Sequence, residues 1–437
     1  MTQGKVLVLG SGLVAAPLVR YLAGRGYELG IGSIEPESAE KMAEGLENVT
    51  VFFADVADEE ATRARVAEYD LVISLVPWQF HPTVAKACLE HKKHLVTPSY
   101  ISDQMAALDG DAKENGLVFL NELGLDPGID HMSAMSIIDR IKGQGGTITG
   151  FASYCGGLPA PENAENPLGY KFSWSPKGVF MAAISPARYL KDGQVVEVPG
   201  DSLFSHCHAL TVGEVGIFEA YPNRDSLKYI DIYGLQGVRT MYRGTLRYEG
   251  WCRLMRGLIK MRVLDPTPVR GLDALTYAQA VGSRVDVSGG NLSQRVVNHI
   301  GYVEGPEVIS AIKWMGLLDD TPIPRGTTSM LDAMVDLLQG RLNYEKDERD
   351  MIVLVHDFTY ELDGETKRLR STMIDFGVPG QDTAMSRTVG LPAAIGADLI
   401  MQGRISSPGV HAPVTSDIYT PILEKLAETG VKFEERG

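Results

Sequence analysis

The sequence is poor in cysteine, and its few cysteines are widely spaced. Cys88, Cys155, Cys207 and Cys252 fit neither a disulfide framework nor the paired ligands of a zinc site. We therefore expect a reducing, cytoplasmic setting and no bound metal. Long apolar runs are also missing, because the longest, residues 71–78, is far too short to span a membrane. The first residues lack the apolar stretch of a signal peptide, so no membrane partner is expected.

Basic residues are in the minority. The 41 lysines and arginines are outnumbered by 56 aspartates and glutamates, which gives a formal net charge of −15. Nucleic acid is excluded as an expected partner, because binding it requires a basic face. An anionic substrate would need a few locally placed arginines, since the overall field repels it. The 437 residues contain no low-complexity tract or repeat, and this length predicts two or three domains.

A glycine-rich turn follows the first apolar run. Residues 5–9 are typical of a buried parallel strand, and a helical stretch begins at Ala16. The pattern between them favours a dinucleotide whose pyrophosphate approaches the glycines and the start of the helix. Alone, the motif also fits a glycine-rich turn of another α/β protein. The predicted cofactor contacts in this turn are Gly10, Ser11, Gly12, Leu13 and Val14.

Further strand-like runs alternate with helical stretches. They cover residues 49–53, 70–76, 94–97 and 117–120. This alternation predicts an α/β fold with a Rossmann doubly wound parallel sheet, in which ligands lie outside the carboxyl ends of the strands. Residues at those ends are predicted cofactor contacts, although they could also be simple strand caps: Asp55, Val56, Leu75, Val76, Thr97 and Pro98.

The turn after the second strand bears on the choice of nicotinamide cofactor. Ser33 and Glu35 are predicted cofactor contacts, and Glu35 lies about twenty residues beyond the glycine motif. An acid there accepts hydrogen bonds from the ribose of NAD and repels the extra phosphate of NADP. Glu35 equally fits the start of a helix. The sequence therefore leans slightly to NAD, with NADP as the alternative.

Several long motifs follow the predicted sheet. They are Asn121–His131, Ser153–Pro161, Asn166–Ser175, Tyr221–Asp225 and Arg243–Tyr248. Together with the glycine motif and residues 99–102, they closely resemble the saccharopine reductase family, the L-glutamate-forming saccharopine dehydrogenases. The resemblance runs nearly end to end, including residues 348–350 and 403–413.

The resemblance implies a domain plan and a reaction. The Rossmann domain would cover 1–128 and 391–437, and an inserted mixed α/β substrate and dimerisation domain would cover 129–264 and 341–390, with a small helical subdomain at 265–340. The implied enzyme is a homodimer that interconverts saccharopine with L-glutamate and 2-aminoadipate 6-semialdehyde in lysine metabolism. Hydride would pass between NAD(P) and an imine.

The resemblance also implies the substrate contacts. Saccharopine carries three carboxylates, and arginine pairs with carboxylates through two parallel hydrogen bonds. Arg224 and Arg247 match family positions that hold these groups. The other implied substrate contacts are Ser99, Tyr100, Asp126, Phe172, Ser173, Trp174, Thr245 and Leu246. Leu123, Gly124, Leu125 and Ser175 complete the predicted cofactor contacts.

Proton transfer at the substrate nitrogen needs a suitably placed acid or base. The candidates are Asp126, Tyr100 and Cys155. Asp126 could instead be a plain helix cap, and Cys155 a small buried side chain. His81 and His131 are assigned structural roles.

Two other functions remain open. A related dehydrogenase of the carboxynorspermidine type would act on another imine of an amino acid and an aldehyde. A Rossmann regulatory protein would bind cofactor without turnover. The sequence also departs from the family, because the arginine that NADP-using members carry after the second strand is missing, and Pro98 replaces a small hydroxyl residue.

Overall fold

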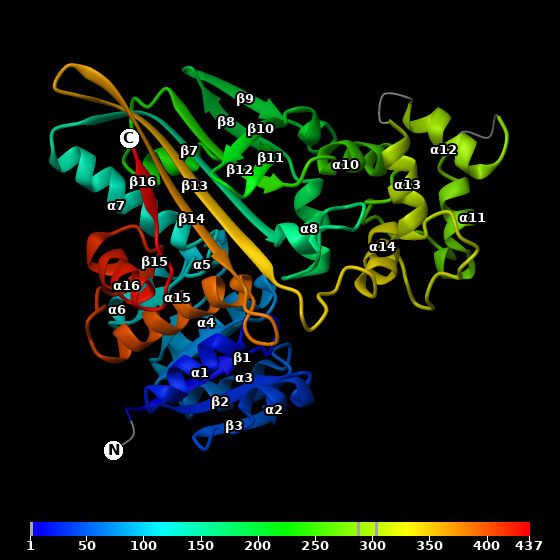
Figure 1. Ribbon diagram of the computed structural model, residues 1–437. Coiled ribbons are helices and arrows are strands. Elements are labelled where there is room, and N and C mark those ends of the chain that lie inside the picture. Colours follow the sequence, from blue (N-terminus) through cyan, green and yellow to red (C-terminus); the bar gives the residue numbers. More distant parts are fainter. Residues whose placement is uncertain (1–2, 286–288, 302–304) are drawn as a thin grey trace. The chain divides into compact units, whose positions relative to one another are not determined.

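A computed structural model describes residues 3–285, 289–301 and 305–437. The chain divides into two compact units, which are described separately. The first comprises the chain up to Thr147 together with Gln381–Phe433. The second comprises Ile148–Gly380 and Glu434–Gly437. Figure 1 shows the chain coloured along its sequence, with the first unit drawn mainly in blue, cyan, orange and red.

The first unit contains a parallel sheet of seven strands in the order β15-β6-β5-β4-β1-β2-β3. The strands are β1 (Lys5–Leu9), β2 (Glu28–Ser33), β3 (Val49–Phe53), β4 (Leu71–Ser74), β5 (His94–Val96), β6 (Val118–Leu120) and β15 (Gly409–His411). This order is that of a doubly wound sheet. Strands β2 and β3 are added on one side of β1, whereas β4 and the strands after it are added on the other side, so the order of strand addition reverses between β1 and β4. The predicted Rossmann fold class is therefore confirmed.

Helices accompany the strands of the first unit. They are α1 (Ala16–Gly24), α2 (Pro36–Ala43), α3 (Glu59–Ala67), α4 (His81–His91), α5 (Asp103–Ala106), α6 (Asp109–Glu114), α7 (Ile129–Gly143), α15 (Ala384–Met401) and α16 (Ser416–Glu428), with a short 3-10 turn at Trp78–Phe80. Helix α1 buries Leu18, Val19 and Leu22 on one face. Helix α15 packs closely on α1, because a Cβ at Gly390 would lie 2.6 Å from the carbonyl oxygen of Val14.

The carboxyl-terminal segment completes this sheet. Strand β15 pairs with β6 in parallel register, with Val410 opposite Phe119. The backbone N–H of Val410 also donates to Asp109 Oδ1 over 2.9 Å. Residues at opposite ends of the sequence therefore share one hydrophobic core.

The second unit contains a mixed sheet of nine strands. They are β7 (Thr147–Pro159), β8 (Ala187–Lys191), β9 (Gln194–Val198), β10 (His208–Val212), β11 (Gly216–Pro222), β12 (Thr240–Arg247), β13 (Asp350–Leu362), β14 (Glu365–Phe376) and β16 (Glu434–Arg436). The pair β12–β7 is parallel, whereas β11–β12 and β13–β14 are antiparallel. This sheet supplies the mixed second layer expected from the family resemblance.

The helices of the second unit include a long series between β12 and β13. They are α8 (Pro176–Ala183), α9 (Lys228–Ile232), α10 (Trp251–Lys260), α11 (Tyr277–Gly282), α12 (Leu292–Ile300), α13 (Gly305–Met315) and α14 (Met330–Gln339), with 3-10 turns at Pro161–Asn163, Gly200–Ser205 and Leu272–Ala274. Buried side chains of α11 to α14 share one core with the sheet. The separate helical subdomain expected at residues 265–340 stays a prediction.

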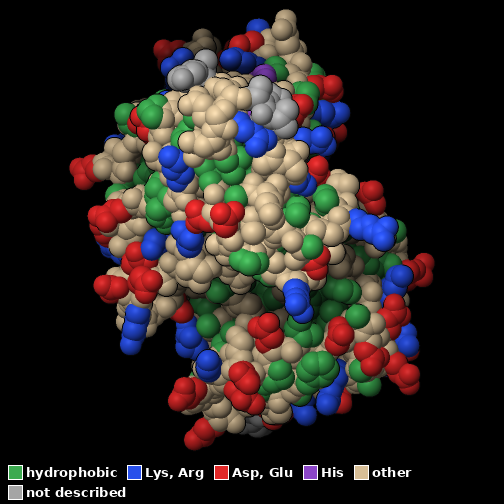
Figure 2. All heavy atoms as spheres, turned by 90° about the vertical axis from the view of Figure 1, so that its right-hand side faces the viewer, with side chains coloured by type: hydrophobic (Ala, Val, Ile, Leu, Met, Phe, Trp, Pro, Cys, Tyr) green, Lys and Arg blue, Asp and Glu red, His purple; other side chains and the backbone are tan. Residues whose placement is uncertain are grey.

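Three features of the described residues bear on possible partners. No helix among them is long and apolar enough to cross a membrane. No three His, Cys, Asp or Glu side chains in the described part of the chain gather in an arrangement that could hold a metal ion. On the face shown in Figure 2, lysine and arginine are interspersed with acidic side chains.

Candidate active site

The turn between β1 and α1 has the shape that a dinucleotide requires. Gly10 has φ +107°, and a Cβ there would lie 3.1 Å from the carbonyl of Leu75. Gly12 is exposed, and no described atom outside its own neighbours comes within 4 Å of its Cβ position. Helix α1, which is described in full, begins without a side-chain cap or an acidic residue in its first turn. Its first N–H groups can therefore hold a pyrophosphate.

Serine side chains connect this turn with the one after β2. The hydroxyls of Ser11 and Ser33 lie 2.7 Å apart. Ser33 Oγ also accepts from the backbone N–H of Glu35 over 3.0 Å. Ser38 Oγ donates to the carbonyl oxygen of Ser11 over 3.2 Å. Glu35 itself is exposed and immediately precedes α2, so this turn is fixed by serines rather than by the acid.

Large apolar side chains are exposed along the carboxyl ends of the strands. Leu13, Ile34 and Trp78 follow β1, β2 and β4, and each is at least 64% exposed. Apolar side chains next to convergent polar groups are typical of ligand sites. These three residues suit the flat ring faces of a dinucleotide.

The remaining predicted cofactor contacts of the first unit differ in accessibility. Asp55 is exposed and accepts from the N–H of Ala57 over 2.9 Å, so it stabilises its own turn. Leu75, Val76 and Pro98 are partly exposed, whereas Val56, Thr97, Leu123, Gly124 and Leu125 are buried.

Residues 123–125 are part of the packed scaffold. A Cβ at Gly396 of α15 would lie only 2.2 Å from Leu123 Cδ2, so the leucine fills the space above that glycine. The N–H groups of Leu123 and Gly124 donate to the carbonyl oxygens of Thr97 and Pro127. The side chain of Leu123 therefore faces the core rather than an open surface.

His81 forms a buried polar chain at the start of α4. Its Nδ1 lies 2.8 Å from Ser74 Oγ, and its Nε2 lies 2.7 Å from Ser99 Oγ. Thr97 Oγ1 lies 3.3 Å from the same nitrogen. Burial lowers the pKa of His81 to about 4, so its ring is neutral near pH 7. Sequence reasoning gave His81 a structural role only, but the ring positions Ser99, a predicted substrate contact.

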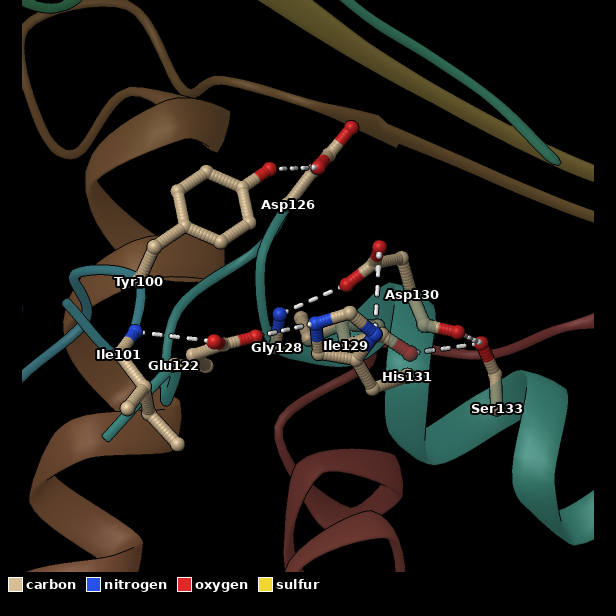
Figure 3. A network of polar contacts seen from close by, with 9 residues as sticks. All are labelled: Tyr100, Ile101, Glu122, Asp126, Gly128, Ile129, Asp130, His131 and Ser133. Carbon is tan, nitrogen blue, oxygen red and sulfur yellow. Dashed lines mark hydrogen bonds and ion pairs between the residues drawn. The ribbon is translucent and has the colours of Figure 1, made fainter. Parts of the chain in front are cut away.

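Tyr100 and Asp126 meet on the loops that follow β5 and β6. The phenol of Tyr100 donates to Asp126 Oδ1 over 3.1 Å (Figure 3). Both side chains are partly exposed. The alternative role of Asp126 as a helix cap is wrong, because the residue capping α7 is Gly128. The structure thus brings together two of the three acid/base candidates.

The third candidate, Cys155, lies in the second unit on β7. In the sheet register it is opposite Thr245 of β12, and Thr245 is opposite Tyr221 of β11. Directly opposed residues share a face of the sheet, and so do residues two apart along a strand. Cys155, Thr245 and Arg247 therefore gather on one face.

Arg247 is a buried cation between aromatic rings. Its side chain is 5% exposed, and its guanidinium lies 4.8 Å from the ring centre of Tyr170 and 5.2 Å from that of Trp251. Its Nη1 donates to the carbonyl oxygen of Leu246 over 2.8 Å. Among the described residues its Nε has no hydrogen-bond partner, and the same holds for the buried Tyr170 Oη, Trp251 Nε1 and Ser173 Oγ. A carboxylate ligand would supply the partner that this cation lacks.

The two predicted arginines occupy different positions on the sheet. Arg247 pairs in register with Glu219, whereas Arg224 follows the end of β11. The separation is 224 − 219 = 5 residues, and the strand ends at Pro222 between them. Arg224 is exposed and has φ +53°. Arg224 therefore lies outside the strand register that places Arg247.

The other predicted residues of the second unit are mostly buried or hold local structure. Phe172 is buried and makes edge contacts with Tyr170 and Phe180. Trp174 is partly buried above Gly178, where a Cβ would lie 2.6 Å from the indole. Leu246 is fully buried, so it can offer only backbone contacts to a ligand. Ser175 Oγ caps α8 by accepting from the N–H of Gly178.

The first unit, with its open glycine turn at the reversal point of a parallel sheet, defines a dinucleotide-binding α/β protein. Two family models match the chain, "Saccharopine dehydrogenase NADP binding domain" at residues 6–120 and "Saccharopine dehydrogenase C-terminal domain" at residues 124–431. The chain belongs to the saccharopine dehydrogenase family, so the family predicted from the motifs is confirmed.

Relatives of known name match over the whole chain. A saccharopine dehydrogenase [NADP(+), L-glutamate-forming] of Pyricularia oryzae is 38% identical, covering 100% of this chain and 99% of the relative. The mitochondrial alpha-aminoadipic semialdehyde synthase of Rattus norvegicus is also 38% identical, but the match covers only 48% of that protein. The structure of apo saccharopine dehydrogenase (L-Glu forming) from Saccharomyces cerevisiae is 35% identical, with a TM-score of 0.88 and 99% of each chain covered.

The comparisons also bear on the cofactor. The family model of the first domain is described as NADP binding, and the Pyricularia oryzae relative carries NADP(+) in its name. The lean toward NAD has no support in them. That lean rested on Glu35 and on the missing arginine after the second strand. The side chain of Glu35 is exposed to water, which screens its charge.

Proposed function

We propose that this chain interconverts saccharopine with L-glutamate and 2-aminoadipate 6-semialdehyde, using NADP, as a step of lysine metabolism. Full-length relatives named as NADP-dependent, L-glutamate-forming saccharopine dehydrogenases support this proposal. Within this chain the observation that carries it is Arg247, a buried guanidinium whose Nε has no partner among the described residues. A substrate with several carboxylates can supply the hydrogen-bond acceptor that this Nε needs.

The residues around Arg247 suit the rest of such a substrate. The rings of Tyr170 and Trp251 hold the guanidinium in place, and Thr245 adds a hydroxyl on the same face of the sheet. Arg224, in the turn that follows β11, would hold a second carboxylate. Phe172, Ser173 and Trp174 would line the remaining wall.

The bound nicotinamide supplies hydride exchange at the substrate carbon. The chain must then move a proton at the substrate nitrogen. Tyr100, whose phenol donates a hydrogen bond to Asp126, would take a proton from the substrate nitrogen as it passes its own proton to the Asp126 carboxylate, and the reverse transfer would return a proton to the nitrogen. Cys155 assists from the face that carries Arg247. The glycine turn, Ser11 and Ser33 would hold the phosphates and ribose of the cofactor.

The proposal extends to assembly and location. A homodimer in the cytoplasm, with a small helical subdomain in the second unit, is the arrangement implied by the family resemblance. Sedimentation equilibrium of the purified chain and fractionation of its native cells test these two points.

A substrate comparison tests the function. The purified chain should oxidise saccharopine with NADP, seen as a steady rise in absorbance of the reduced nicotinamide. In the reverse direction it should use 2-aminoadipate semialdehyde with L-glutamate. Turnover only with a diamine in place of glutamate would support a dehydrogenase of the carboxynorspermidine type. Cofactor binding without any turnover would support a regulatory protein.

A further inference from the structure

A buried chain of polar groups lies directly behind Tyr100 and Asp126. Glu122, Asp130 and His131 are each at most 4% exposed. His131 Nε2 lies 2.9 Å from Glu122 Oε2, and His131 Nδ1 lies 3.7 Å from Asp130 Oδ2. Figure 3 shows the imidazole between the two carboxylates. None of these three residues belongs to the substrate and cofactor contacts described above.

Glu122 holds the backbone on both sides of Tyr100. The N–H of Glu122 donates to the carbonyl oxygen of Ser99 over 3.0 Å. Its Oε1 accepts from the N–H of Ile101, also over 3.0 Å. The two peptide groups that flank Tyr100 are therefore tied to one residue, and the phenol is left to point toward Asp126 (Figure 3).

Asp130 holds the segment that carries Asp126. Its Oδ1 accepts from the N–H of Gly128 over 2.7 Å, two residues beyond Asp126. His131 contacts both Asp130 and Glu122, so it connects the segment that carries Asp126 with the residue that holds the loop after β5. A shift of Glu122 or His131 would therefore change the distance between the phenol of Tyr100 and the carboxylate of Asp126.

Glu122 adopts a backbone conformation that is costly for its residue type. Its φ is +55°, in the left-handed region that side chains with a Cβ rarely occupy. Residues keep such a conformation only when their surroundings determine it, and these residues concentrate at functional sites. Two buried carboxylates would also be costly here without the hydrogen bonds that they make.

We infer that Glu122 and His131 are positioning residues, which set the geometry of the Tyr100–Asp126 pair without touching substrate. The inference rests on the proposed function, in which Tyr100 and Asp126 act at the substrate nitrogen. A misplacement of the reacting groups by about 1 Å lowers turnover by up to about a hundredfold. Cofactor binding should change little, because the hydrogen bonds described here hold residues 99–101 and 122–131 and not the glycine turn.

A double-mutant cycle on the full chain tests the inference. The variants are Glu122→Ala, Glu122→Gln, Tyr100→Phe and the double variant Glu122→Ala/Tyr100→Phe. Glu122→Ala should lower kcat for saccharopine by about tenfold or more and leave the Kd of NADP within about twofold. Glu122→Gln should recover most of kcat, because its amide oxygen can still accept from Ile101. In the Tyr100→Phe background, Glu122→Ala should cost little more, because its effect passes through Tyr100.

A control variant, Asp109→Asn, and a second variant of the network, His131→Asn, complete the test. Asp109→Asn perturbs another carboxylate that accepts a backbone N–H in the same unit, that of Val410, and should leave kcat unchanged. If Glu122→Ala fails to fold, His131→Asn takes its place in the cycle, because the shorter asparagine side chain cannot contact Glu122 and Asp130 at the same time. Additive losses in the cycle, or an unchanged kcat in Glu122→Ala and His131→Asn, would overturn the inference. If Tyr100→Phe alone leaves kcat unchanged, the role proposed for Tyr100 fails, and the positioning inference fails with it.

Discussion

At the scale of single residues, the arginines of the second unit illustrate how burial separates function from surface charge. Arg349 is 39% exposed on its side chain and pairs with Glu162, so its contribution is that of a surface ion pair. Arg247 is 5% exposed and stacks on two rings. A cation removed from water without a full set of partners is costly unless a ligand completes its hydrogen bonds.

Replacing Arg247 by lysine should therefore impair substrate binding. Lysine keeps the charge but loses the planar fork that pairs with a carboxylate. We expect the KM for saccharopine to rise by about tenfold to a hundredfold, which corresponds to the loss of one charged hydrogen bond. The Kd of NADP should not change, and initial-rate kinetics with a fluorescence titration measure both. Arg349→Lys is the control, because its guanidinium also lies over a ring, that of Phe376. Equal effects of the two variants would contradict a ligand role for Arg247.

Glu35 offers a second test at this scale. Its carboxylate follows β2, where the 2′-phosphate of NADP is held in dinucleotide-binding folds. Replacing it by glutamine removes a like charge, so kcat/KM with NADP should rise about twofold to fivefold, consistent with a screened surface interaction. Activity with NAD should fall or stay the same. Glu40→Gln on the exposed side of α2 should change neither value. A fall in NADP activity in Glu35→Gln would show that the acid supports the cofactor.

At the scale of elements, the turn from β1 to α1 forms a phosphate site because it lacks side chains at Gly10 and Gly12 and a side-chain cap on α1. The backbone of Gly10 fits only without a side chain, and Gly12 leaves an open space above the first N–H groups of α1. A helix begins with unpaired donors, and α1 provides them no side-chain acceptor within its described length. Strand, turn and helix together thus present positive partial charge to a phosphate.

Adding a methyl group at Gly12 should block the cofactor without disturbing the fold. No described atom beyond its neighbours lies within 4 Å of the new Cβ, so the midpoint of thermal unfolding without cofactor should not fall. The Kd of NADP should rise by about tenfold or more, because the pyrophosphate needs that space. Gly24→Ala, at the end of the same helix, is also open and should leave the Kd unchanged. Unchanged NADP binding in Gly12→Ala would show that the pyrophosphate lies elsewhere.

At the scale of the whole molecule, the chain has two compact units, and the first is built from both ends of the sequence. This unit also contains the buried His81. The ordinary pKa of histidine is 6.5, and burial lowers that of His81 to about 4. Between these values the unfolded chain binds a proton that the folded chain does not. The folded state therefore loses stability as the pH falls through this window.

Replacing His81 by glutamine should flatten this pH dependence. From the two pKa values, protonation of His81 in the unfolded chain lowers the free energy of unfolding by about 2 kcal/mol between pH 7 and pH 5. The unfolding midpoint of His81→Gln in urea should therefore decline less between pH 7 and pH 5 than that of the parent chain. His91→Gln on the same helix is the control. Parallel declines in His81→Gln and the parent chain would contradict the burial effect.

The sequence alone determined the architecture of the first unit and its cofactor turn. Residues 5–9 and 49–53 coincide with β1 and β3, because short β-branched runs between turns have few other stable arrangements. The long motifs also identified the family. These features are local or depend on sequence order, so they can be found without coordinates.

Tertiary structure decided the rest. Glu122, which contacts His131, also holds the loop after β5, and only the pairing of parallel strands brings these segments together. The burial of Arg247 between Tyr170 and Trp251 depends on contacts between segments far apart in the chain. Hydrogen bonding and desolvation depend on distance in space, and a linear pattern of residue types does not specify that distance.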